Sequence, residues 1–300
     1  RRIKMDLSSQ NCLVSTEWLE CNLQVESLRI VESTSLIPNY FEENEEDKTK
    51  RESGRSLWDS EHITGSIYVD LLTELSDDKD GRFMYGMPSI EQFSSVMSQK
   101  GISNTNGLVI YDRTTNMWAA RLWWMLRAFG FENAVVLDGG YSKWIAEERP
   151  TDNLVVDYPS TSFTVNPKPE FIADRDRVIQ ATTSAKTCLI NALDTNEFEG
   201  KPPHRYGRGG RIPGSQNVPF SETVDLETQL YSNDEQSIKL FVDVGVKNAD
   251  EIICYCGGGI AACSTALLLT KLGHKKVSVY DGSMTEWCAD PSLPLESGKL

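Results

Sequence analysis

Residues 253–269 read ICYCGGGIAACSTALLL, a stretch in which an apolar run stops at a glycine cluster and a run of small and apolar residues follows. The apolar run ends on Cys256, and Gly257, Gly258 and Gly259 come directly after it. A short apolar run bounded by glycines is typical of a buried strand. Glycines let the backbone turn tightly with several N–H groups pointing inward. The stretch therefore predicts a strand–loop–helix junction in which the thiol lies where the strand ends and the loop begins.

The place of Cys256 in this junction favours a nucleophile. The inward N–H groups and the positive end of a helix starting near Ile260 would stabilise an anion at the sulfur. The thiol is therefore expected to react as a thiolate. Most cysteines are instead buried and inert, and Cys254 and Cys263 are interpreted in that way.

The junction is one part of an internal repeat. GLVIYDR at 107–113 matches EIICYCG at 251–257, and DGGYSKW at 138–144 matches DGSMTEW at 281–287. Upstream of both, HITGSIYV begins at His62 and RIPGSQNV begins at Arg211. The three blocks recur in the same order at a nearly constant offset of one domain length, which indicates a duplicated domain.

Strand-like runs alternate with amphipathic stretches in both copies. Such alternation predicts an α/β protein in which each domain is a mainly parallel sheet with helices on both faces. The expected domains are residues 1–148 and 170–300, joined by a linker at 149–169 that is rich in Pro, Ser and Thr. The acidic run at 41–56 is interpreted as a solvated surface insertion.

The composition argues against several classes of protein. The 300 residues carry a net charge of −14, whereas nucleic-acid-binding domains show a basic footprint, so no nucleic-acid partner is expected. No apolar run reaches the roughly 18 residues that span a bilayer, so no membrane association is expected. Seven cysteines without a CxxC pair and only three histidines favour reduced thiols over a zinc site or a disulfide framework.

The chain resembles the tandem-domain rhodanese family, which includes thiosulfate and 3-mercaptopyruvate sulfurtransferases. HITG and RIPG, the paired YDR and YCG loops, and the LDGGYSKW and YDGSMTEW stretches carry the resemblance. It covers nearly the whole chain apart from the acidic insertion and the extreme N-terminus. The family pairs an inactive first copy with a catalytic second copy. Asp112, which stands at the position of Cys256, fits that pattern because a carboxylate cannot become a persulfide.

The resemblance implies a sulfurtransferase that passes sulfur from a donor to a thiol or to cyanide through a Cys256 persulfide. The N–H groups expected to hold this persulfide are those of Gly257, Gly258, Gly259, Ile260 and Ala261. No metal or organic cofactor is required. The expected partners are a small sulfur donor and a thiol acceptor such as a thioredoxin-like protein. The chain is expected to be a monomer or weak dimer in the cytoplasm, with the mitochondrion as the alternative compartment.

The loop sequence favours 3-mercaptopyruvate over thiosulfate as the donor. Thiosulfate members of the family carry basic residues inside the loop, and none lies between Cys256 and Ala262. Mercaptopyruvate members typically read C-G-S-G-V-T-A, so Gly258 replaces a serine. Ala262 also stands where related phosphatase loops carry an arginine, which disfavours phosphatase chemistry.

Several family cations are absent from this chain. The two arginines that hold the mercaptopyruvate carboxylate correspond to Glu197 and Pro213, and an Asp–His pair of the first copy falls near Leu72 and Gly86. These losses favour an alternative function, a catalytically weak rhodanese-fold binding or regulatory protein. A compensating cation cluster is predicted on the Gly-rich loop at 204–211. Its candidate donor-binding residues are Arg205, Arg208 and Arg211.

Overall fold

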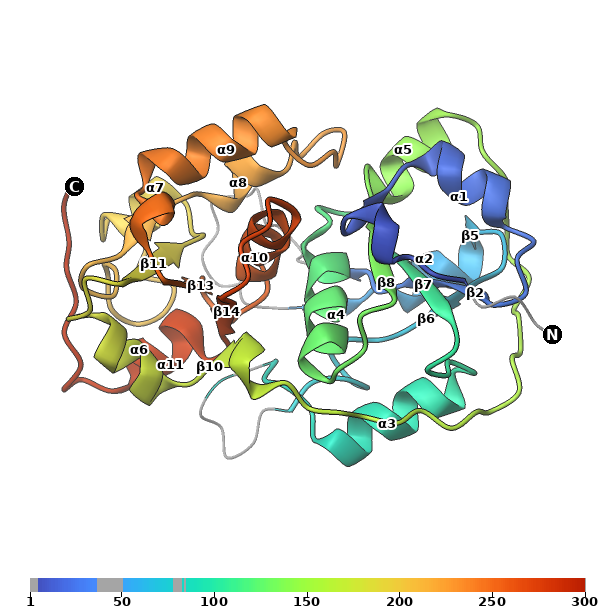
Figure 1. Cartoon of the computed structure of the whole chain (residues 1–300), viewed down its shortest axis with the longest axis horizontal. Helices are drawn as coiled ribbons and strands as arrows, with labels where there is room; N and C mark the ends of the chain where they lie inside the picture. The colour runs from blue at the N-terminus through green and yellow to red at the C-terminus, as the bar shows by residue number, and fades with distance from the viewer. Residues whose placement is uncertain (1–4, 37–50, 78–82, 84, 300) are drawn as a thin grey trace. The chain divides into compact units, whose positions relative to one another are not determined.

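The structure of the chain is a computed structural model that describes residues 5–36, 51–77, 83 and 85–299. The chain divides into two compact units, which are considered separately (Figure 1). The first unit contains Arg1–Ser76, Met87–Lys168 and Leu226–Tyr231, and the second contains Asp77–Gly86, Pro169–Asp225 and Ser232–Leu300. No helix in the described part of the chain is long and apolar enough to cross a membrane.

The first unit is built on a five-stranded sheet. The strands of the whole unit are β1 (Leu13–Val14), β2 (Leu28–Glu32), β3 (Ser35–Leu36), β4 (Glu52–Ser53), β5 (His62–Ile63), β6 (Ser66–Tyr68), β7 (Gly107–Tyr111), β8 (Ala134–Leu137) and β9 (Thr151–Asp152). Of these, β3 with β4 and β5 with β9 form two separate two-stranded sheets. Its α-helices are α1 (Thr16–Asn22), α2 (Arg55–Ser60), α3 (Ile90–Gln99), α4 (Met117–Ala128) and α5 (Gly140–Ala146). The sheet order is β1-β8-β7-β2-β6, and all of its pairs are parallel.

The second unit repeats this topology. Its strands are β10 (Ile172–Ala173), β11 (Thr187–Asn191), β12 (Gln216–Asn217), β13 (Glu251–Tyr255) and β14 (Val277–Tyr280). Its α-helices are α6 (Arg175–Ala181), α7 (Thr195–Phe198), α8 (Phe220–Thr223), α9 (Asp234–Asp243), α10 (Ala262–Lys271) and α11 (Ser283–Ala289). The order β10-β14-β13-β11-β12 is again parallel throughout. The predicted α/β class with two mainly parallel sheets is confirmed.

The duplication extends to hydrogen bonds of buried tyrosines. The hydroxyl of Tyr111, at the end of β7, accepts the Ile63 N–H at 3.3 Å. The hydroxyl of Tyr255, at the end of β13, accepts the Ile212 N–H at 3.2 Å. In each unit the central strand is thereby tied to the motif that begins at His62 or Arg211.

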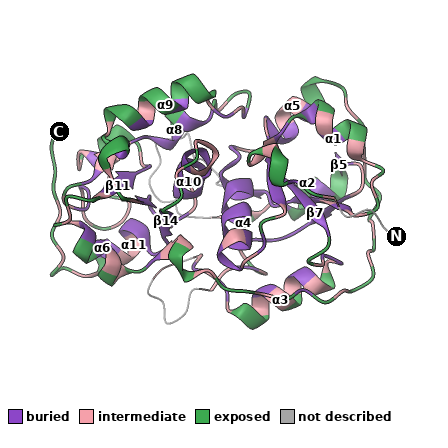
Figure 2. Cartoon of the chain, in the orientation of Figure 1, coloured by how far each residue is buried: buried purple, intermediate pink, exposed green. Residues whose placement is uncertain are grey.

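Apolar sequence accounts for the central layer of each unit. All five residues of β7 are buried, as are four of the five residues of β13, which is the pattern of a parallel strand covered on both faces. Helix α4 packs on β7 and β8, and α10 packs on β13 and β14. Both helices are buried along most of their length (Figure 2). The tryptophans of α4 are therefore packing residues of the first unit.

Contacts of the first unit continue into the predicted linker. Most of the predicted linker, up to Lys168, belongs to the first unit. Phe163 is 3% exposed and packs against Phe93, and β9 pairs with β5. Apolar burial and strand pairing therefore attach this segment to the first unit. The predicted acidic insertion at 41–56 lies outside the described residues up to position 50. From 51 onward it forms β4, which pairs with β3, and the start of α2.

Candidate active site

Cys256 follows the last residue of the central strand β13 and is 3% exposed. Helix α11 fixes the backbone at this point. The Cys256 N–H donates to Ser283 Oγ at 3.1 Å, and the Cys256 carbonyl accepts the Met284 N–H at 3.0 Å. The next carbonyl, that of Gly257, accepts both the N–H and the hydroxyl of Thr285 at 2.9 and 2.7 Å. These hydrogen bonds fix the backbone that carries the thiol. They hold Cys256 at the carboxyl ends of the strands, where binding sites of α/β proteins lie.

The loop after Cys256 offers unused hydrogen-bond donors. Within the described part of the chain, the N–H groups of Gly257, Gly258, Ile260 and Ala261 form no hydrogen bond, either to the Cys256 sulfur or to any other group. Gly259 has φ +74°, a conformation that favours glycine. Helix α10 begins at Ala262, two residues later than predicted. The loop thus has donors available for an anion that extends beyond the thiol.

The equivalent loop of the first unit already holds an anion, because the Asp112 side chain folds back into it. Asp112 Oδ1 accepts the N–H groups of Thr114, Thr115 and Asn116 at 2.8 to 3.0 Å. Its Oδ2 accepts those of Trp118 and Ala119 at 3.0 Å. The Thr114 hydroxyl also donates to Oδ1, at 3.2 Å. The carboxylate is fully buried, so this loop geometry can bind a negative charge mainly by backbone N–H groups.

A short segment from later in the sequence covers the Asp112 loop. Residues Leu226–Tyr231 belong to the first unit. The Gln229 carbonyl accepts Asn116 Nδ2 at 2.6 Å, and Gln229 Oε1 accepts the Ser142 N–H at 3.1 Å. Gln229 is 1% exposed. Sequence reasoning missed this segment because a lone glutamine between two helices carries no local signal.

Arg208 and Arg211, two of the three predicted donor-binding residues, have structural partners. Arg208 Nη1 and Nη2 donate to the Leu293 carbonyl at 3.0 and 2.9 Å. Arg211, whose side chain is 6% exposed, donates to the Gly298 carbonyl at 2.7 Å and stacks on Phe198. These contacts hold the C-terminal segment against the loop at 204–211.

Arg205 differs from the other two arginines. Its side chain is 24% exposed, and its Nε lies 3.4 Å from Glu197 Oε1. Among the described residues its guanidinium forms no hydrogen bond to a backbone carbonyl, but it lies close enough to Asp194 to help lower the pKa of that carboxyl. Of the three candidates, Arg205 is more exposed than Arg211 and is held by carboxylates and not by backbone carbonyls of the C-terminal segment.

Other thiols of the second unit are poorly suited to react. Burial raises the pKa of the Cys188 thiol to about 11 and raises the pKa of Cys254 well above its ordinary value. Burial also raises the pKa of Cys288, against the opposing effect of Arg208. Cys263 is fully buried and donates to the Gly259 carbonyl at 3.1 Å. These thiols are therefore structural, as predicted for Cys254 and Cys263.

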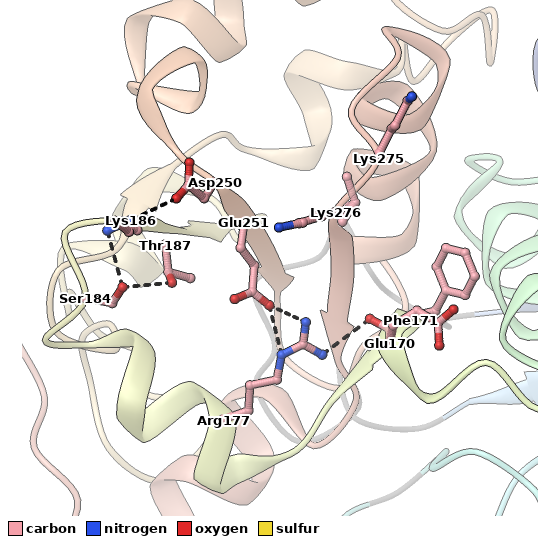
Figure 3. Close-up of a pocket in the computed structure, with 11 residues that line it drawn as sticks. Glu170, Phe171, Arg177, Ser184, Lys186, Thr187, Asp250, Glu251, Lys275 and Lys276 are labelled. Atoms are coloured by element: carbon pink, nitrogen blue, oxygen red, sulfur yellow. Dashed lines mark hydrogen bonds and ion pairs between the residues drawn. The ribbon is translucent and has the colours of Figure 1, made fainter.

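A pocket of about 490 Å³ lies elsewhere in the second unit (Figure 3). It opens at the amino ends of β11, β13 and β14, whereas Cys256 follows the carboxyl end of β13. Most of its charges pair with one another. Arg177 Nε lies 2.9 Å from Glu251 Oε1, and Lys186 Nζ lies 3.4 Å from Asp250 Oδ2. This pocket is at the opposite edge of the sheet from the candidate nucleophile.

Comparison with known proteins agrees with this architecture. The rhodanese-like domain matches residues 42–147 and again residues 183–290. A putative thiosulfate sulfurtransferase of Mycobacterium bovis is 34% identical over 295 residues, covering 95% of this chain and 98% of the relative. The mitochondrial thiosulfate/3-mercaptopyruvate sulfurtransferase 1 of Arabidopsis thaliana is 31% identical, covering 97% of this chain and 79% of the relative.

Solved structures share the fold. SseA from Escherichia coli, a 3-mercaptopyruvate sulfurtransferase, superposes with a TM-score of 0.76 at 25% identity, covering 91% of this chain and 98% of its own. Tum1 from Saccharomyces cerevisiae gives a TM-score of 0.79 at 22% identity, with 96% and 98% covered. Two α/β repeats with one loop cysteine at the sheet edge define a tandem-domain sulfurtransferase. The chain belongs to the rhodanese-like family.

Proposed function

We propose that the protein transfers sulfane sulfur through a persulfide on Cys256, with 3-mercaptopyruvate preferred over thiosulfate as the donor. The observation that carries this proposal is the set of unpaired N–H groups in the loop after Cys256. The matching loop of the first unit binds the Asp112 carboxylate with such groups. A persulfide is an anion one atom longer than the thiolate. It would accept hydrogen bonds from the N–H groups after Cys256, which are equivalent to those that bind Asp112 in the first unit.

The reaction consists of two sulfur transfers. The Cys256 thiolate attacks the sulfur of the donor, and an S–S bond forms as the donor's C–S bond breaks. The electron pair of that bond leaves with the pyruvate carbon as an enolate, which then takes up a proton. An acceptor thiolate, or cyanide, next attacks the outer sulfur, and the S–S bond breaks to return the Cys256 thiolate. The acceptor proposed in the cell is a small thiol or a thioredoxin-like protein.

Arg205 is proposed to bind the anionic end of the donor. Arg205→Ala should raise the donor KM about tenfold or more, because it removes a charge-assisted contact. Arg208→Ala and Arg211→Ala should instead lower the free energy of unfolding by about 1–3 kcal/mol, because they remove charge-assisted hydrogen bonds that hold the C-terminal segment, and should raise the KM less than Arg205→Ala does. Steady-state kinetics and chemical denaturation of the three variants test this division. An unchanged KM in Arg205→Ala would reject the assignment.

One experiment tests the persulfide itself. Reduced protein and its Cys256→Ser variant are incubated separately with 3-mercaptopyruvate and with thiosulfate. Intact mass and the yield of thiocyanate after addition of cyanide are then measured. The expected result is a gain of one sulfur on the unmodified chain alone, larger with 3-mercaptopyruvate. A sulfur adduct retained by Cys256→Ser would assign the chemistry to another thiol, and an equal or larger adduct with thiosulfate would reverse the donor preference.

A binding or regulatory protein with weak turnover is the second candidate function. Glu197 and Pro213 stand where the resemblance places arginines, and this absence of cations is the observation that favours it. The same experiment separates the two functions, because a binding protein would form no adduct with either donor.

We place the protein in a reducing compartment, the cytoplasm or the mitochondrion, because its described cysteines are all free thiols.

A further inference from the structure

The pocket of about 490 Å³ in the second unit is a concave site that the proposed sulfur transfer does not use (Figure 3). It lies at the amino ends of β11, β13 and β14, where backbone hydrogen bonds fix the starts of the three strands. The Lys186 carbonyl accepts the Asp250 N–H at 2.8 Å, and the Lys276 carbonyl accepts the Ile252 N–H at 2.9 Å. The pocket has the volume of a small-molecule site, and charged side chains from the starts of all three strands line it.

One ion pair forms a fixed wall of this pocket. Arg177 Nε donates to Glu251 Oε1 at 2.9 Å. Arg177 Nη1 also donates to the carbonyls of Glu170 and Ile172, at 3.3 Å each. The charge of Glu251 is therefore already compensated, and Arg177 has a structural role.

Two lysines of the pocket lack such a partner. Lys275 and Lys276 come directly before β14, and both are exposed. Among the residues that the structure describes, neither ammonium group forms an ion pair or a hydrogen bond. Two adjacent positive charges therefore line a concave surface of a chain whose net charge is −14, and they favour an anionic ligand at that place.

The pocket also holds hydroxyl and carboxylate groups, around the start of β11 (Figure 3). Ser184 Oγ accepts the Lys186 N–H at 3.2 Å and the Thr187 hydroxyl at 3.1 Å. In the described part of the chain the Ser184 proton itself has no acceptor. Asp250 pairs with Lys186 at 3.4 Å, but the two side chains are 65% and 80% exposed, so this pair is weak. A carboxylate here repels a second anionic group but can accept hydrogen bonds from hydroxyls.

We propose that this pocket binds a small phosphate monoester that carries free hydroxyl groups, as a sugar phosphate does. The phosphate binds to Lys275 and Lys276, because an ammonium group attracts phosphate as a point charge. The hydroxyl groups of the ligand bind to Ser184 and Asp250. This site goes beyond the proposed sulfur transfer and does not depend on it, since Cys256 follows the opposite end of β13.

A small ligand fits the observations better than a macromolecule. The cations lie in a pocket, whereas the net charge of the whole chain is −14. This charge repels extended polyanions such as nucleic acids and anionic membranes. A single phosphate on a small polar molecule meets the two lysines without bringing further negative charge close to the rest of the surface.

Calorimetry at low ionic strength, with ribose 5-phosphate as the probe, tests the phosphate contact. Lys275→Ala/Lys276→Ala should weaken binding about 10- to 100-fold, because it removes charge-assisted contacts. Lys239→Ala/Lys247→Ala is the matched control, since it removes two exposed lysines of the same unit that lie outside the pocket. The control should bind as the unmodified chain does. Equal affinities in the two double variants, or no binding by the unmodified chain, would overturn the proposal.

The choice of probe tests the hydroxyl contact. Ribose and inorganic phosphate should each bind about tenfold or more weakly than ribose 5-phosphate, because each lacks part of the contacts. Ser184→Ala should weaken binding of ribose 5-phosphate about threefold to tenfold and leave binding of inorganic phosphate unchanged. An equal loss for both probes would contradict the assignment of the hydroxyl groups. Binding to vesicles that contain phosphatidylinositol 4-phosphate, without binding of ribose 5-phosphate, would assign the pocket to a lipid headgroup and overturn the small-ligand proposal.

Discussion

Replacing Asp112 with alanine is expected to lower the free energy of unfolding of the first unit by about 3–5 kcal/mol. The buried carboxylate accepts five backbone N–H groups, which belong to residues between Thr114 and Ala119. Alanine would leave all five without their acceptor, and buried donors without a partner are costly. Asp112→Asn should cost less, because one oxygen can still accept three of the five.

Chemical denaturation followed by tryptophan fluorescence measures this loss, since Trp118 and Trp123 are buried in α4 of the same unit. Asp59→Ala is the control, because the Asp59–Arg55 pair is about half exposed and such pairs contribute less than about 1 kcal/mol. A loss below about 1 kcal/mol in Asp112→Ala would show that the carboxylate does not hold the loop.

The second large effect is expected from Trp287, and the repeat provides its control. Trp287 and Trp144 are both fully buried, and their indole N–H groups donate to the carbonyls of Pro294 and Pro150 at 2.9 and 3.0 Å. Replacing either with alanine should destabilise its own unit by about 3–5 kcal/mol, because a large cavity is left. The two variants should therefore lose similar amounts of stability.

Their effects on activity should differ. Trp287 anchors α11, whose residues Ser283 and Thr285 bind the backbone of Cys256 and Gly257. Trp287→Ala should therefore lower kcat at temperatures where the protein is still folded, whereas Trp144→Ala should keep a kcat close to that of the unmodified chain. Turnover and unfolding are measured side by side for both. Equal kcat values in the two variants would mean that α11 does not position the loop.

Local patterns were enough to predict the duplicated α/β fold and the different residues, Cys256 and Asp112, at its two equivalent loops. Continuous apolar runs predict buried parallel strands because such strands are covered on both faces. Each loop, GGGIA after Cys256 and RTTNM after Asp112, is contiguous in the sequence. The anion-binding character expected of both follows from backbone N–H groups, which every residue except proline supplies.

The partners of individual side chains could be assigned only from the tertiary structure. Nothing near Arg208 in the sequence indicates that it binds Leu293, and nothing near Gly257 indicates that it faces Tyr206. The sequence likewise gave no sign that Gln229 covers the Asp112 loop. These contacts join residues far apart in the chain, and which of several arginines or tyrosines becomes a partner depends on how the sheet, the helices and the C-terminal segment pack. Hydrophobic periodicity determines which residues are buried, but the polar groups around Cys256 are selected by three-dimensional proximity.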